Sequence, residues 1–87
     1  MHTVFCLMAR HDARVLIPVG VVVADYFPHL STDKFIRKVS LGDISLPLIR
    51  IDASSQKSAK GVHILDLAQY IDKRRAAAAK ESNQLTS

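Results

Sequence analysis

PVGVVVADYFPHLSTDKFIRKVSLG, residues 18–42, is the stretch of sequence that decides the fold, because it predicts two helices joined by a short turn. The valines and Gly20 favour a strand in its first part. Apolar residues nevertheless recur there at the spacing of one helix face, namely at Val19, Val22, Val23 and Tyr26. We therefore predict a helix over residues 18–27, with Pro18 at its first position, where the missing N–H costs no hydrogen bond, and with Pro28 ending it.

The second helix of this stretch follows the turn at residues 28–30. Ser31 is a good N-cap residue, Asp33 suits the positive end of the helix dipole, and Gly42 supplies the stop. One predicted face is apolar and contains Phe35, Ile36 and Val39. The opposite face contains Lys34, Arg37, Lys38 and Leu41. We expect the first face to pack and the second to present its positive charges to solvent.

Downstream of this stretch the sequence predicts a β-hairpin. Residues 46–51 favour a strand, which Pro47 places at a sheet edge or at the start of the strand. A second short strand is predicted at residues 61–64. The polar, serine-rich residues 52–60 between the strands suit a hairpin loop. We call this loop the wing.

The last predicted helix begins near Leu65 or Asp66 and ends near Lys80. Its expected buried stripe consists of Ile64, Leu67, Ala68 and Ile71. Beyond this stripe a run of four alanines keeps helix propensity high. Residues 82–87 are predicted to form a flexible tail, so residues 1–81 would form a single domain.

Upstream of residues 18–42 the sequence predicts two short elements. Thr3 can cap a helix that ends near His11 and has Val4, Leu7 and Met8 on one face. Residues 15–17 favour a short strand because they are apolar and partly β-branched.

Composition places the chain among packed globular domains that do not cross a membrane. It has 87 residues, of which 48% are hydrophobic and 23% charged. The longest apolar run, residues 15–24, is far shorter than a membrane-spanning helix, and nothing at the start resembles a secretory signal. We therefore expect a cytoplasmic protein. The net charge of +4 invites a polyanionic partner, although weakly.

The sequence contains no motif for catalysis or for a metal ion. Its four histidines have no spacing that places two on one helix face, and its three glycines are too few for a phosphate-binding loop. We therefore expect no metal, no cofactor and no enzymatic activity. Cys6 is the only cysteine, and we expect a buried, inert thiol.

The order of these elements indicates how the positive charge could be used. A helix, a turn, a helix with a basic face, a hairpin with a basic tip and a final helix together predict an α+β winged helix-turn-helix domain of the excisionase or MerR-like kind. The major groove of DNA admits one helix, while a hairpin reaches flanking phosphates. The alternative is that a basic helix face is merely solvated. The candidate DNA-binding residues are Ser31, Thr32, Lys34, Arg37, Lys38, Arg50, Gln56, Lys57 and Lys60.

Several segments resemble the pyocin activator family of short bacterial and prophage regulators. They are TVFCLMA (3–9), IPV (17–19), DYF (25–27), SLGDISLP (40–47), SQK (55–57) and VHILDLAQYID (62–72). The resemblance runs from about Thr3 to Arg75 and is most specific in its second half. It implies a positive transcription factor that binds a promoter-proximal DNA element and switches on a bacteriocin or prophage gene cluster. The base-reading helix would then correspond to residues 32–41 and the wing to residues 52–60.

Two other functions are compatible with the sequence. An excisionase-like factor that bends DNA during site-specific recombination is the first alternative, and a small adaptor that binds protein through its valine-rich and alanine-rich helices is the second. For a DNA-binding activator, associated with the nucleoid when bound, we expect a homodimer or higher oligomer on double-stranded DNA, and RNA polymerase is a possible partner. The apolar face of the N-terminal helix is the favoured dimer surface, and the last helix beyond Ile71 is the other.

Overall fold

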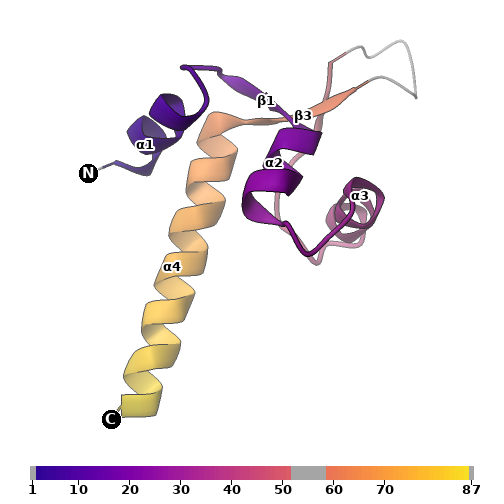
Figure 1. The fold of residues 1–87 in the computed structure, drawn as a ribbon. Coiled ribbons are helices and arrows are strands. Elements are labelled where there is room, and N and C mark those ends of the chain that lie inside the picture. Colours follow the sequence, from indigo (N-terminus) through magenta and orange to yellow (C-terminus); the bar gives the residue numbers. More distant parts are fainter. Residues whose placement is uncertain (1, 52–58, 87) are drawn as a thin grey trace.

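The computed structural model of the protein describes residues 2–51 and 59–86. Four helices and three short strands form an α+β fold (Figure 1). In chain order they are α1 (Thr3–Arg10), β1 (Leu16–Pro18), α2 (Val19–Tyr26), α3 (Thr32–Ser40), β2 (Ile49–Arg50), β3 (Lys60–His63) and α4 (Ile64–Thr86). This order is compatible with the predicted winged helix-turn-helix.

The three strands form one small antiparallel sheet with the order β1-β3-β2. The Cα atom of Leu16 lies opposite that of His63, and the Cα atom of Ile49 lies opposite that of Gly61. Glycine at this position of β3 allows a close approach to β1, because a Cβ atom on Gly61 would lie 3.0 Å from the Leu16 side chain and 3.1 Å from the carbonyl oxygen of Ile17. Close approach of the two backbones therefore fixes the sheet at the base of the hairpin.

One hydrophobic core joins the sheet to the helices. The largest fully buried side chains come one each from β1, α2, α3, β3 and α4, and they are Ile17, Val22, Phe35, Val62 and Leu67. Aromatic rings extend this core, since the ring centroid of Phe27 lies 4.9 Å from that of Phe35 and 5.9 Å from that of Tyr70. The pair α2 and α3 is thus held against the rest of the fold by the apolar face of each helix.

The structure confirms both helices predicted within residues 18–42. The Ser31 hydroxyl oxygen accepts a hydrogen bond from the backbone N–H of Lys34 at 3.2 Å, so Ser31 is the N-cap of α3. Gly42 has a φ of +83°, a left-handed conformation that glycine adopts at the end of a helix. The prediction for Pro18 was wrong by one position, because Pro18 ends β1 and stands at the N-cap position of α2.

The predicted first strand of the hairpin was too long. Only Ile49 and Arg50 pair with β3, whereas residues 45–48 form no strand. Pro47 has no N–H to donate to a neighbouring strand, and the N–H of Leu46 donates instead to the carbonyl oxygen of Ile44. Leu46 is nevertheless buried, so this segment packs against the core without pairing to a strand.

The last helix is longer than predicted at both ends. α4 begins at Ile64, directly after β3, and the backbone N–H of Leu65 donates to the Nδ1 atom of His63 at 3.1 Å. It continues past Lys80 to Thr86, because the sequence there contains no proline or glycine to stop it. The expected stripe is confirmed, with Ile64, Leu67 and Ala68 buried and Ile71 packed against the core. The flexibility of residues 82–87 stays a prediction.

The N-terminal helix packs against α4, and this corrects three expectations. Thr3 is not the cap of α1; that position belongs to His2, and the Thr3 hydroxyl donates to the Asp72 carboxylate at 2.5 Å. Cys6 is exposed rather than buried, because the turn of α1 directs its neighbour Leu7 inward. Leu7 is only 5% exposed and joins the core, so the face that we expected to form a dimer is used within the chain.

Polar side chains join the ends of α1 and α2. The Arg10 guanidinium lies 3.1 Å from the Asp25 carboxylate, and a hydrogen bond of 2.8 Å links the buried His11 Nε2 to the Tyr26 hydroxyl. Burial raises the pKa of the Tyr26 phenol, and the Asp25 carboxylate raises it further. This cluster fixes how the chain leaves α1.

The turn after α1 contains backbone strain at two consecutive residues. Asp12 has a φ of 56° and Ala13 a φ of 60°, and a left-handed alanine costs roughly 1–2 kcal/mol. Ala13→Gly should therefore raise the free energy of unfolding by about 0.5–1 kcal/mol, after the added chain entropy of glycine is subtracted. Urea denaturation measures this change. The control Ala24→Gly, on the exposed side of α2, should lower the same quantity by roughly 0.5–1 kcal/mol, and a similar loss at both positions would contradict the strain.

Candidate nucleic-acid interface

The exposed face of α3 carries three cations. Lys34, Arg37 and Lys38 are all exposed, while Phe35 on the opposite face is fully buried. This division follows from the helical repeat, because residues three and four apart share a face. Burial of Phe35 therefore fixes which way the charged side chains point.

These cations line a hollow in the protein surface. The hollow has a volume of about 360 Å³, and its lining consists of Lys34, Arg37, Lys38, Leu41 and Asp43. Leu41 is 67% exposed, so its apolar side chain is accessible at the edge of this hollow. The surface thus combines several N–H donors with an apolar contact, a combination that suits the edges of bases.

The cations of α3 have no carboxylate partner within residues 2–51 and 59–86. Among these residues the Arg10 guanidinium pairs with the Asp25 carboxylate, which also lies 3.9 Å from the His11 ring, at the ends of α1 and α2. The donor groups of these three side chains are therefore not engaged in ion pairs with the described part of the chain. An exposed, uncompensated charge is available to an anionic partner.

Two further predicted residues lie at the start of α3. The Ser31 hydroxyl is engaged in capping the helix, and Thr32 is half-buried as its first residue. Both lie where the unpaired N–H groups of a helix N-terminus favour a phosphate group. Its role as the N-cap is sufficient to explain why a serine occupies position 31, whether or not a ligand binds there.

The hairpin places two cations opposite each other. The Cα atom of Arg50 in β2 lies opposite that of Lys60 in β3, and Arg50 is exposed while Lys60 is half-buried. We had predicted Lys60 to lie in the hairpin loop, and this was wrong, because Lys60 is the first residue of β3. Gln56 and Lys57 lie outside the described residues. The described hairpin arms thus supply a second basic position, in the sheet rather than on α3.

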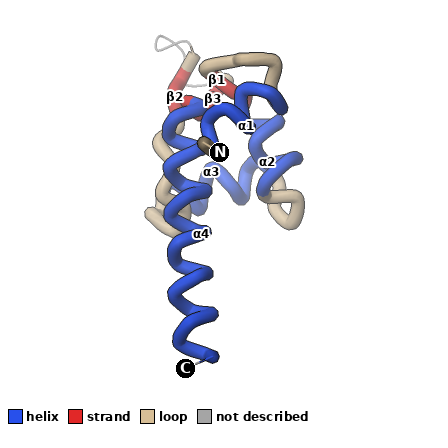
Figure 2. The backbone as a smooth tube through the Cα atoms, turned by 90° about the vertical axis from the view of Figure 1, so that its left-hand side faces the viewer, coloured by secondary structure: helices blue, strands red, loops and turns tan. Residues whose placement is uncertain are grey.

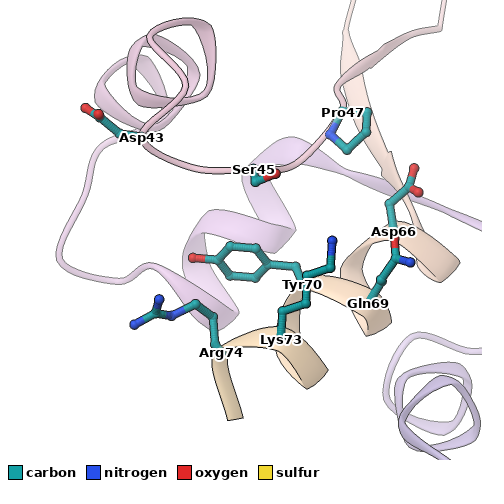
Figure 3. A pocket seen from close by; sticks show the side chains of 8 residues that line it. All are labelled: Asp43, Ser45, Pro47, Asp66, Gln69, Tyr70, Lys73 and Arg74. Atoms are coloured by element: carbon teal, nitrogen blue, oxygen red, sulfur yellow. The ribbon is translucent and has the colours of Figure 1, made fainter. Parts of the chain in front are cut away.

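The sequence prediction missed a second hollow, between residues 43–47 and α4. It has a volume of about 620 Å³ and is lined by Asp43, Ser45, Pro47, Asp66, Gln69, Tyr70, Lys73 and Arg74 (Figure 3). Its two walls are far apart in the sequence, so no spacing rule could join them. The only available signal was the basic run at residues 73–75, where the apolar stripe of α4 ends.

The described residues give no sign of a metal site or of a membrane span. Among residues 2–51 and 59–86, no three histidine, cysteine, aspartate or glutamate side chains are grouped as metal ligands. No helix in that part of the chain is both long enough and apolar enough to span a bilayer.

Comparison with known families agrees with the resemblance found in the sequence. The model of the family described as "Pyocin activator protein PrtN" matches residues 3–78. The chain belongs to this family. The match includes α1 to α3, the hairpin and the part of α4 that packs on the core. No curated protein and no solved structure matches the chain.

Proposed function

We propose that this pyocin activator family member is a sequence-specific DNA-binding protein that activates transcription of a bacteriocin or prophage gene cluster. The observation that carries the proposal is the exposed, uncompensated basic face of α3, on a helix whose other face is locked into the core. Membership of the pyocin activator family supports the same function. The domain would act as a winged helix-turn-helix, in which α2 and α3 form the helix-turn-helix and the β2–β3 hairpin carries the wing.

In this proposal α3 enters the major groove. The groove is about 12 Å wide and admits one helix, whose exposed side chains then reach the base edges. Arg37 and Lys38 would donate to guanine, and Leu41 would contact a thymine methyl group. Arg50 and Lys60 on the hairpin would contact flanking phosphates, which fix the position of the protein but do not read sequence.

The proposal includes assembly of more than one protomer on DNA. One domain of this size reads too few base pairs to select a promoter among the competing sites of a genome. Two protomers related by a two-fold axis would read half-sites separated by whole turns of the duplex. Because the apolar face of α1 is used within the chain, α4 beyond Ile71 is the surface that remains of the two considered. RNA polymerase would be the further partner of an activator.

A mobility-shift titration of the full chain tests this function. The probe is DNA from upstream of a pyocin gene cluster, and the control is a shuffled fragment of equal length and composition. We expect the upstream DNA to bind at least about 10³-fold more tightly, the lower end of the range for specific regulators. A reporter fused to the same DNA should be switched on by the protein. Equal affinity for both fragments would contradict sequence-specific activation.

A further inference from the structure

The hollow between residues 43–47 and α4 adjoins the basic face of α3. Asp43 lines this hollow and also the hollow on α3, so the two meet at the segment that follows α3. Figure 3 shows the Lys73 side chain rising from α4 toward the segment of Ser45 and Pro47 and the Tyr70 ring lying across the hollow below Ser45, while the Asp43 carboxylate points away from them. A duplex that contacts α3 would thus pass close to this part of α4.

The hollow contains donors that suit a phosphodiester group. Lys73 and Arg74 form no ion pair within the described part of the chain, although Asp43 and Asp66 also line the hollow. A guanidinium group and an ammonium group both bind phosphate, the first through two parallel hydrogen bonds and the second as a point charge. The hydroxyl groups of Ser45 and Tyr70 add neutral donors.

The neighbouring cation Arg75 lies on a different face of α4. It lines a separate, shallower hollow with Asp72, Ala76 and Ala79. This difference follows from the helical repeat, which turns each successive residue by about 100°. Of these two adjacent arginines, Arg74 lines the hollow between residues 43–47 and α4, and Arg75 lines the other one.

We propose that the hollow between residues 43–47 and α4 holds a phosphate of the DNA backbone beside the site of α3, with Lys73 and Arg74 as its main contacts. The inference rests on the proposed function, since the phosphate belongs to the duplex that α3 reads. Such contacts on both sides of a recognition helix fix its register in the groove. The alternative source of the same chemistry is a free phosphate ion.

The test compares two double variants that each remove two exposed positive charges. The first is Lys73→Ala with Arg74→Ala, and the control, which lies outside α4 and its proposed role in assembly, is Arg10→Ala with Arg14→Ala. Affinity for upstream DNA and for shuffled DNA is measured over a range of salt concentrations. We expect the first variant to lower the slope of log affinity against log salt by about 1.8, that is 0.9 for each lost phosphate contact, on both DNAs. The control should keep the slope of the parent protein.

Each other result would overturn the inference or the proposed function. An unchanged slope, or an equal fall in both double variants, would remove the hollow from the interface. A loss confined to upstream DNA would indicate base reading instead of phosphate contact. If inorganic phosphate shifts the side-chain NMR signals of Arg74 while the DNA slope stays unchanged, the hollow binds a free ion. If the parent protein shows no preference for upstream DNA while the slope still falls by about 1.8 in the first variant, the proposed sequence-specific function fails and the phosphate contact stands.

A further variant keeps the test independent of folding. Lys73→Arg preserves the charge and should keep the slope of the parent protein. The side chains of Lys73 and Arg74 are both exposed, so the circular dichroism spectra of the variants at these two positions should match that of the parent protein.

Discussion

Leu7→Asp should unfold the protein. Leu7 is 5% exposed and packs into the core where α1 meets α4, so the variant would bury a carboxylate without a partner and lose an apolar side chain. Deleting a buried leucine alone costs about 2–5 kcal/mol, and an unpaired buried charge adds to this. The total is comparable to the whole stability of a domain of this size, about 0.05–0.15 kcal/mol per residue.

Thermal denaturation followed by circular dichroism measures this effect. Phe5→Asp is the matched control, because Phe5 lies on the same helix but is 61% exposed, and its replacement should leave the melting temperature nearly unchanged. A folded Leu7→Asp protein that has lost only its cooperative binding to two half-sites would show that this face joins protomers after all.

Arg37→Ala combined with Lys38→Ala should abolish the preference for upstream DNA over shuffled DNA. Both side chains are exposed on the face of α3 opposite Phe35, where they can reach base edges. A bidentate contact with a base contributes about 1–3 kcal/mol of discrimination, so the double variant should lose a factor of roughly 10² or more in specificity.

Competition titrations with both DNAs measure this loss. Arg14→Ala removes an exposed cation from the turn after α1 and should leave the specificity ratio unchanged. An equal loss of affinity on both DNAs would make Arg37 and Lys38 phosphate contacts, and unchanged affinity would remove α3 from the interface.

The helices were predictable from the sequence wherever local signals agreed. For α3, the apolar spacing, the Ser31 cap and the Gly42 stop all indicate the same boundaries, and the structure has them. For α2, the spacing of the valines outweighed their strand propensity, because the core that receives Val22 and Val23 stabilises the helix. The basic face of α3 was predictable for the same reason.

Other features depend on contacts that no local pattern describes. An apolar face on α1 indicates burial, but the sequence does not say whether α4 or a second protomer covers it. The short β2 reflects competition between strand propensity and Pro47, which has no N–H to pair. The hollow beside α4 exists only because the fold brings residue 45 near residue 73.

The direct junction between β3 and α4 makes the last helix a lever attached to the hairpin. No loop separates His63 from Ile64, and both views show α4 extending beyond the other elements (Figures 1 and 2). At 1.5 Å per residue, its 23 residues span about 34 Å. Because Ile64, Leu67, Ala68 and Ile71 hold the start of α4 in the core, this helix would turn together with the whole domain. A turn of the domain by about 10° on a duplex would move the far end of α4 by roughly 6 Å, the length of about four helical residues.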